Sequence, residues 1–289
     1  MAQVAEAKLE GTDHSVLADV AAGLAELSRT LGDTEAADRN SKAAENASDQ
    51  WRAVQPLRME SPGEAFPVMH AACDRSYIEQ FRLLRTQLLL HRSRVGRDCD
   101  FRCVTVMSTL AEEGKTFTAA NLAAVLAISS GQRVLLMEAD PLGPGFHAQL
   151  GMTSNPGLVH ALAAPEDWMK CLRQLPGTPL YVMPRGTPNS NALNQVDFEP
   201  LPVLLEVLRS HFEWIVIDGT SFSESPDAQW LAALADGNLL VVRQGVATFN
   251  QVHDSLRRIP PERLVGVVMN QRKAKRRRWF QFRVKIRRS

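Results

Sequence analysis

The sequence predicts an α/β fold with a doubly wound, mostly parallel sheet. From residue 101 onward, short apolar runs rich in branched residues alternate with spacers that are long enough for crossover helices. Continuous runs of this kind are typical of strands buried on both faces of a parallel sheet. Their order fits a sheet that is covered by helices on both sides. Strands are expected at residues 103–107, 133–137, 179–183, 214–217, 238–242 and 264–269.

The chain ahead of the first strand divides into an appendage and a helix. Residues 16–31 carry leucine and valine at helical spacing, whereas residues 33–65 are polar and punctuated by proline, as in a linker. Residues 75–95 have an amphipathic pattern that predicts a long helix. We therefore expect an N-terminal helical and flexible appendage, an α/β domain and a basic tail, at residues 1–65, 66–271 and 272–289.

The composition narrows the function classes. The 289 residues carry a formal net charge of +1, which says nothing on its own because the charge is segregated: no acidic residue follows Glu262, where arginine and lysine are frequent. The four cysteines form no CxxC pair, so we expect reduced structural thiols rather than a zinc site. No apolar run reaches about eighteen residues, and no signal-peptide pattern opens the chain. These features favour a cytoplasmic protein.

A phosphate-binding loop is the clearest functional signal. The first apolar run leads into a loop that ends in Gly114, Lys115 and Thr116, and a helix-like pattern follows. In such loops backbone N–H groups surround the phosphates, the lysine neutralises them and the hydroxyl reaches Mg²⁺. ATP and Mg²⁺ are therefore the predicted ligands, with Thr116 as a metal ligand. The predicted nucleotide-binding residues of this segment are Glu113, Gly114, Lys115, Thr116 and Phe117.

Two positions make this loop irregular. Thr109 stands where a full Walker A motif has its first glycine, and Glu112 lies at the tip of the loop. Glycine at the tip adopts a positive φ without penalty and lets the backbone approach phosphate. A glutamate adds bulk and negative charge beside the phosphates. Two like charges ~4 Å apart cost about 1 kcal/mol in water and about 4 kcal/mol at an effective dielectric constant of about 20.

Carboxylates follow two other strands. Glu138 and Asp140 come at the end of the second apolar run, and Asp218 comes at the end of the fourth. Ligands of open parallel sheets bind at the carboxyl ends of the strands. Asp218 would hold Mg²⁺ through water, and Asp140, with Glu138, would be the candidate base. Alternatively, Asp140 caps the turn that Pro141 begins. The candidate catalytic residues are Lys115, Glu138, Asp140 and Asp218.

Taken in order, these motifs resemble the bacterial tyrosine kinase (BY-kinase) family. The family consists of P-loop proteins tied to capsule and exopolysaccharide synthesis and export, and it is related to deviant-Walker partitioning and septum-placing ATPases. The resemblance covers about residues 74–271. It implies a P-loop NTPase fold. It also implies that Asn270, at the end of the last expected strand, reads adenine.

The resemblance carries expectations about assembly. Glu79, Arg82 and Arg85 reproduce the ExxRxxR motif that mediates subunit contacts in the family, which implies a homo-oligomer. The family also implies a partner, an inner-membrane polysaccharide chain-length or export protein. The expected location is therefore cytoplasmic and peripheral at the inner membrane.

The departures from the family pattern fall in the catalytic motifs. The proline and glycine of the loop are replaced by Ala111 and Glu112. The D-x-D-x-R motif is Glu-Ala-Asp-Pro-Leu here, so its first aspartate is Glu138 and its arginine is Leu142. The extra methylene of Glu138 can displace a base or metal by roughly an ångström, which is enough to cost about a hundredfold in rate. Impaired catalysis is the expected result.

The end of the chain departs as well. The family's autophosphorylating members carry a C-terminal tyrosine cluster, whereas this chain has only Tyr77 and Tyr181, so self-phosphorylation of a tail cluster is excluded. Residues 280–287 instead alternate apolar and basic side chains. The alternation predicts an amphipathic strand or a segment on an anionic membrane surface. An edge strand and a disordered tail are alternatives, and nucleic-acid binding is the least favoured.

Three functions follow from these observations. The first is a BY-kinase-like protein that regulates or scaffolds exopolysaccharide or capsule biosynthesis and export, with impaired or absent tyrosine kinase activity. The second is an active tyrosine kinase or ATPase of the export machinery. The third is a membrane- or nucleoid-associated partitioning-type ATPase. Leu110 argues against the third, because it occupies the position of that group's signature lysine.

Overall fold

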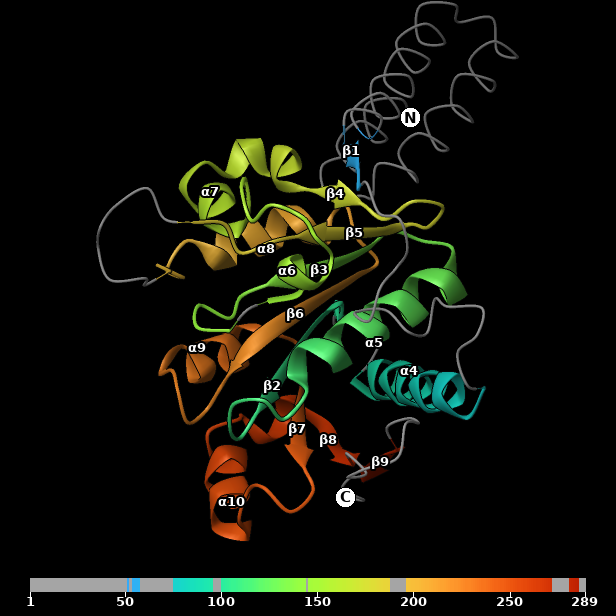
Figure 1. The fold of residues 1–289 in the computed structure, drawn as a ribbon, viewed down its shortest axis with the longest axis vertical. Coiled ribbons are helices and arrows are strands. Elements are labelled where there is room, and N and C mark those ends of the chain that lie inside the picture. The colour runs from blue at the N-terminus through green and yellow to red at the C-terminus, as the bar shows by residue number, and fades with distance from the viewer. Residues whose placement is uncertain are drawn as a thin grey trace, which may run out of the picture.

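The computed structural model describes residues 51, 54–57, 75–95, 100–143, 145–187, 196–271 and 281–285. The helix expected at residues 16–31 lies outside the described residues. Within the described part, the chain folds into one sheet with helices on both faces (Figure 1). The α/β, doubly wound fold class predicted from the sequence is confirmed.

The described residues form a nine-stranded sheet with the order β1-β4-β5-β3-β6-β2-β7-β8-β9. The six expected strands are present as β2, β3, β5, β6, β7 and β8, and they pair in parallel. β4 is antiparallel to β5, and β9 is antiparallel to β8. The strands are β1 (Gln55–Pro56), β2 (Cys103–Ser108), β3 (Val134–Glu138), β4 (Arg173–Gln174), β5 (Leu180–Met183), β6 (Trp214–Ser221), β7 (Gly237–Arg243), β8 (Leu264–Gln271) and β9 (Gln281–Lys285).

Helices join these strands as crossovers. The longest is α4 (Arg75–Val95), which has the bounds expected from the amphipathic pattern. The others in the described part are α5 (Lys115–Ser130), α6 (Gly145–Gln149), α7 (Leu158–Ala163), α8 (Leu201–Arg209), α9 (Asp227–Leu234) and α10 (Phe249–Arg257), with short 3₁₀ turns at Pro165–Cys171 and Pro261–Arg263.

Helices α4 and α5 cover one face of the sheet (Figure 1). The middle of α5 is rich in alanine, and Ala119, Ala123 and Ala127 are completely buried. Small side chains let the helix lie close to the strands. The larger apolar residues of α4, among them Phe81 and Leu88, fill the space beside it. This packing holds the start of α5, and with it the phosphate loop, against the sheet.

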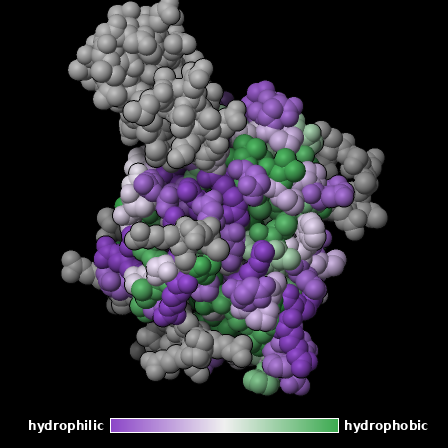
Figure 2. Space-filling model, turned by 180° about the vertical axis from the view of Figure 1, so that it is seen from behind, coloured by the Kyte–Doolittle hydropathy of each residue, from purple (hydrophilic) through white to green (hydrophobic). Residues whose placement is uncertain are grey.

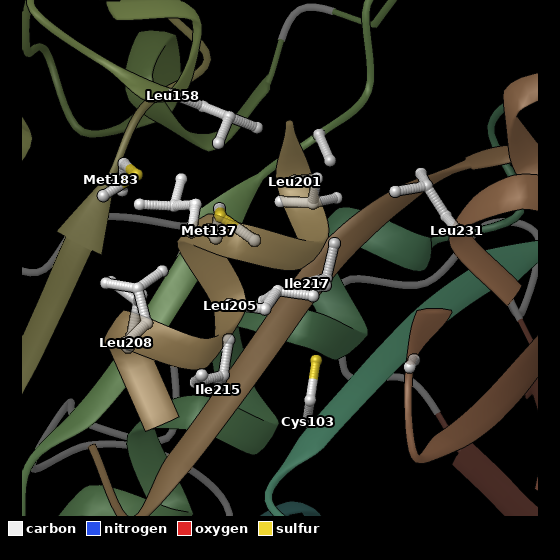
Figure 3. Close-up of a cluster of buried hydrophobic side chains, with 14 of the residues drawn as sticks. Cys103, Met137, Leu158, Met183, Leu201, Leu205, Leu208, Ile215, Ile217 and Leu231 are labelled. Atoms are coloured by element: carbon white, nitrogen blue, oxygen red, sulfur yellow. The ribbon is translucent and has the colours of Figure 1, made fainter. Parts of the chain in front are cut away.

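Helices α7, α8 and α9 cover the opposite face, and Figure 3 shows the apolar side chains that fill the space between them and the strands. Alternate residues of β3 and β6 point into this second core, because successive side chains of a strand face opposite sides. The labelled members are Cys103, Met137, Leu158, Met183, Leu201, Leu205, Leu208, Ile215, Ile217 and Leu231. The sheet is therefore buried on both sides, as its apolar runs predict.

A polar contact fixes the amino-terminal edge of the sheet. Asp236, just before β7, accepts hydrogen bonds from the backbone N–H groups of Arg102 (2.9 Å) and Cys103 (2.7 Å). It also accepts two hydrogen bonds of 2.7 Å from the guanidinium of Arg209, at the end of α8. A bidentate Arg–carboxylate pair is among the stronger polar contacts in proteins. Asp236 thus ties β2, β7 and α8 together.

Part of the predicted linker packs onto the domain, which corrects the linker prediction for these residues. Val54 and Leu57 are buried, and β1 pairs with β4 between them. The Trp51 ring lies edge-on to Tyr181, with centroids 4.9 Å apart, and the guanidinium of Arg133 lies 4.2 Å from the Trp51 centroid. Aromatic burial of this kind outweighs the polar composition of the surrounding segment.

The basic tail contributes an edge strand. β9 runs antiparallel to β8 at the end of the sheet, which is the edge-strand alternative for residues 281–285. Residues 272–280 and 286–289 lie outside the described residues. None of the helices in the described ranges is both long and apolar enough to cross a membrane. Figure 2 shows the side opposite to Figure 1, where apolar areas lie between hydrophilic ones.

Candidate functional site

The phosphate loop connects β2 to α5 at the carboxyl edge of the sheet. Gly114 precedes the helix with φ +98°, a conformation that glycine adopts without strain. A Cβ atom at this position would lie 2.4 Å from Nδ2 of Asn270, so the close approach of β8 also requires glycine. Lys115 and Thr116 then open α5, as the loop motif predicts. The partial positive charge of a helix N-terminus favours a bound anion.

The carboxylate of Glu113 braces this loop from inside. Its Oε2 accepts a hydrogen bond from the N–H of Leu110 (2.8 Å), and its Oε1 accepts one from the N–H of Arg243 (3.0 Å) at the end of β7. Burial raises the pKa of Glu113, and the backbone N–H groups oppose that rise. The sequence assigns Glu113 to nucleotide binding, but in the structure its carboxylate stabilises the conformation of the loop.

Glu112 has a strained backbone. Its φ is +57°, and it is the one non-glycine residue with positive φ among the described residues. Residues with a Cβ avoid this left-handed region, at a cost of roughly 1–2 kcal/mol. The Glu112 side chain is exposed. Glycine would suit this position, because the loop holds residue 112 in a left-handed backbone conformation that glycine adopts without strain.

Lys115 and Asp140 form a buried ion pair. Nζ of Lys115 lies 2.8 Å from Oδ2 of Asp140, and the two side chains are only 9% and 3% exposed. Oδ1 of Asp140 accepts a hydrogen bond from the N–H of Leu142 (3.1 Å). Asp140 therefore also caps the turn after β3, which is the alternative that the sequence left open. The lysine expected to clamp phosphate already has an anionic partner.

Glu138 points to α6. Both of its carboxylate oxygens lie near Nδ1 of His147, at 3.0 and 2.8 Å, and the side chain is completely buried. A Cβ atom on Gly145 would lie 1.7 Å from Oε1 of Glu138, so glycine there makes room for the carboxylate. Burial raises the pKa of Glu138, and His147 and Arg185 oppose the rise. The candidate base is held by a partner of its own.

Asp218 is the acidic group that lacks a hydrogen-bond partner. It pairs in register with Glu138 on β3, it is completely buried, and neither carboxylate oxygen has a partner at hydrogen-bond geometry within the described residues. Burial raises the pKa of Asp218 to about 8, and Glu138 and Asp140 add to the rise, while Lys115 and the Thr116 hydroxyl nearby oppose it. An orphaned buried carboxylate of this kind indicates a cation or donor that binds there.

The donor set fits Mg²⁺. Asp218 and the Thr116 hydroxyl offer oxygen ligands, and Mg²⁺ is commonly held by one or two protein oxygens together with waters and phosphate oxygens. No cluster of three or more His, Cys, Asp or Glu side chains suited to a metal ion occurs in the described part of the chain.

Two further residues assigned to the nucleotide contact other parts of the fold. Nδ2 of Asn270 donates to the carbonyl of Glu113 (2.8 Å), so β8 supports the loop through this side chain. Phe117 packs toward α4, where its ring centroid lies 5.8 Å from that of Tyr77 and 6.5 Å from that of Phe81. Adenine recognition by Asn270 and nucleotide contact by Phe117 stay predictions.

The residues of the expected oligomer motif lie on α4, apart from the loop. Glu79 and Arg82 form an exposed pair, with 2.6 Å between Oε1 and Nη1, and their side chains are 62% and 59% exposed. Arg85 is half-buried one turn further along the helix. Their role in subunit contacts stays a prediction.

Both tyrosines are buried. Tyr77 is 1% exposed within the first core, and Tyr181 is 5% exposed within the second. A tyrosine must reach the nucleotide with its hydroxyl to accept a phosphoryl group. Neither tyrosine can do so while the domain is folded.

Sequence reasoning missed Arg185, which follows β5. Its Nη1 donates to the carbonyls of Asp140 (2.7 Å) and Gly143 (3.3 Å), so it supports the turn that carries Asp140. Its position in the sequence could have indicated this role. Arg185 follows an expected strand, and the carboxyl ends of the parallel strands lie at the same edge of the sheet as the loop and the acidic residues.

Comparison with known proteins identifies related domains. Residues 104–278, more than half of the chain, match the family described as CobQ/CobB/MinD/ParA nucleotide binding domain. The succinoglycan biosynthesis transport protein ExoP of Rhizobium meliloti is 32% identical over 174 residues, which are 58% of this chain and 22% of ExoP. The tyrosine-protein kinase YwqD of Bacillus subtilis is 26% identical over 197 residues, which are 68% of this chain and 81% of YwqD.

The solved structures agree with these relatives. The BceF tyrosine kinase domain aligns with a TM-score of 0.55 and 25% sequence identity, over 66% of this chain and 76% of that domain. The resemblance inferred from the motifs is therefore confirmed: the relatives include tyrosine kinases and a succinoglycan biosynthesis transport protein. The chain spans about a fifth of the length of ExoP.

Proposed function

This chain belongs to the CobQ/CobB/MinD/ParA nucleotide-binding domain family, and we propose that it regulates or scaffolds exopolysaccharide or capsule biosynthesis and export, with impaired or absent tyrosine kinase activity. The observation that carries the proposal is the buried Lys115–Asp140 pair. In this arrangement the phosphate-clamping group is neutralised inside the protein, and Glu112 adds a negative charge at the loop tip.

ATP and Mg²⁺ are the proposed ligands. Lys115 would bind the β- and γ-phosphates, while Thr116 and Asp218 would hold Mg²⁺, which neutralises phosphate charge when it is bound. For Lys115 to reach phosphate, Asp140 must share or lose its partner. An unpaired buried charge costs about 3–5 kcal/mol, so the site is expected to bind nucleotide weakly.

Three features support impaired phosphoryl transfer to tyrosine. The candidate base Asp140 is paired with Lys115, and the candidate base Glu138 is paired with His147. A carboxylate that is hydrogen-bonded to an internal partner must give up that contact before it can accept a proton from a substrate. The chain also offers no accessible tyrosine of its own, because both of its tyrosines are buried. A regulatory role needs the fold and its contacts, and these are retained.

One observation favours a second function, an active kinase or ATPase of the export machinery. Asp218 keeps the position and the unpartnered carboxylate that a magnesium site requires. Such an enzyme would act on another protein. The proposed partner is an inner-membrane polysaccharide chain-length or export protein. The proposed location is cytoplasmic and peripheral at the inner membrane, with the basic tail at an anionic membrane surface and α4 in homo-oligomer contacts.

Calorimetric titration of Mg·ATP and Mg·ADP tests the proposal. Lys115→Ala removes the clamp, and Lys170→Ala is the matched control, because Lys170 forms an exposed pair with Asp167 at 2.7 Å. We expect weak binding that only the first variant abolishes, together with no phosphate transfer to a tyrosine peptide. Transfer that is abolished by Lys115→Ala would establish the kinase instead. If the wild-type protein binds neither nucleotide, the proposed nucleotide binding is wrong and only the scaffolding role remains.

A further inference from the structure

Arg185 closes the turn that carries Asp140. It lies just beyond β5, the strand next to β3, and its Nη1 donates to the carbonyls of Asp140 (2.7 Å) and Gly143 (3.3 Å). One guanidinium thus bridges the first and last residues of the turn. Both hydrogen bonds come from one nitrogen, and the side chain of lysine is one bond shorter, so its Nζ would fall short of this position.

The turn is wound tightly around the carboxylate. Oδ1 of Asp140 accepts from the N–H of Leu142, and a Cβ atom on Gly143 would lie 2.8 Å from Oδ2. That same Oδ2 faces Nζ of Lys115. A small change in the turn therefore moves the oxygen that pairs with the loop lysine.

The backbone of Arg185 is itself anchored. Its carbonyl accepts a hydrogen bond of 2.9 Å from the N–H of Val159, near the start of α7. The next residue, Gly186, has φ +82°, and a Cβ atom there would meet the ring of His160 at 2.9 Å. The backbone of Arg185 is therefore held by α7, and its guanidinium extends from there to the turn that carries Asp140.

The arginine of the D-x-D-x-R motif is absent, and Leu142 in its place is 57% exposed. The guanidinium at this turn comes from a different strand. We infer that Arg185 is a positioning residue: it holds the turn of residues 140–143 so that Asp140 engages Lys115. The inference rests on the proposed function, because the Lys115–Asp140 pair is what weakens phosphate binding there.

The test reads the pair directly, without nucleotide. Lys115 is labelled with an amine-reactive ester, and mass spectrometry follows the rate, with the exposed Lys170 as the reference within each sample. Arg185→Lys keeps the charge but loses the bridge. We expect Lys115 in this variant to be labelled about tenfold faster than in wild type, the factor that corresponds to about 1.4 kcal/mol. Asp140→Asn sets the upper limit, and the double variant should be no faster than Asp140→Asn alone.

Arg263→Gln is the matched control. Nη1 of Arg263 also contacts two backbone carbonyls, those of Ala233 and Ala235, but near the start of β8 at the other edge of the sheet. It should leave the labelling of Lys115 unchanged, and circular dichroism checks that each variant is folded. An unchanged rate in Arg185→Lys, or an effect that adds to that of Asp140→Asn, would overturn the inference. The proposed function fails on a different measurement, the nucleotide titration.

Discussion

Replacing Glu112 by glycine should repair the phosphate loop in two separable ways. The residue adopts φ +57° while its side chain is exposed, so the backbone carries strain and the side chain brings charge without packing. Glycine removes both effects. Glutamine at this position removes the charge only, because it keeps the Cβ. The pair of variants, Glu112→Gly and Glu112→Gln, therefore separates strain from electrostatics.

The expected magnitudes follow from the structure. Relief of a left-handed conformation gains roughly 1–2 kcal/mol, and the greater freedom of glycine in the unfolded chain removes about 0.5–1 kcal/mol of it. The net gain of about 0.5–1 kcal/mol corresponds to a rise in melting temperature of about 1–4 °C for a domain of this size. Two charges ~8 Å apart repel by about 0.5 kcal/mol in water and by about 2 kcal/mol at an effective dielectric constant of about 20. Loss of the Glu112 charge should therefore tighten Mg·ATP binding about tenfold.

Thermal melts and calorimetry check these values. Glu112→Gly should raise both the melting temperature and the affinity, whereas Glu112→Gln should raise the affinity alone. Affinities that match wild type in both variants would show that phosphate does not approach the loop tip. A lower melting temperature in Glu112→Gly would contradict the strain argument.

The remaining predictions concern the buried carboxylate of Asp218 and the partly buried carboxylate of Asp236. The pKa of Asp218 in the folded protein is raised to about 8 from an ordinary value of 3.8. Between these two pH values the Asp218 carboxyl is ionised in the unfolded chain and protonated in the folded protein. The contribution of Asp218 to stability should therefore fall as pH rises from about 4 to about 8. In metal-free buffer above pH 8, Asp218→Asn should be the more stable protein, by at most about 6 kcal/mol. Urea unfolding at several pH values that gave a constant difference between the two proteins would contradict this. Asp236→Ala leaves two backbone N–H groups without their acceptor and removes the carboxylate partner of Arg209, which keeps its hydrogen bond to the carbonyl of Asp100. This variant should lower the free energy of unfolding by about 3 kcal/mol. The exposed-pair control Asp167→Ala should change it by less than about 1 kcal/mol, and equal losses in the two variants would refute the role of Asp236.

The central strands and the loop could be predicted because their signals are local. Each strand of the parallel core is a continuous apolar run, and burial on both faces demands such a run. The loop residues lie next to one another in sequence. The strand β1 has only two residues, Gln55 and Pro56, and both are exposed, so no periodicity marks it. Its position depends on Trp51, whose ring contacts come from residues more than eighty positions away.

The candidate site was harder to predict than the fold, since its contacts join distant segments. The sequence placed Lys115, Asp140 and Asp218 at one edge, but it could not show which charge pairs with which. Glu138 illustrates the difficulty. Its extra methylene was expected to misplace a base, whereas in the structure the carboxylate lies against Gly145 and reaches His147. Arg185 was missed because its partners are backbone carbonyls, which no side-chain pattern records.

The pairing of these charges is the physical basis of the weak catalysis that we propose for a loop with most of its motif. Lys115 is paired with Asp140, and Glu138 is hydrogen-bonded to His147, so these groups already have partners inside the protein. A ligand must then displace internal partners rather than fill open positions, and part of its binding energy is lost in breaking them. Asp218 is different, since its carboxylate has no hydrogen-bond partner among the described residues. A cation at Asp218 would relieve an existing cost, so Mg²⁺ has more to gain from this site than the phosphates have.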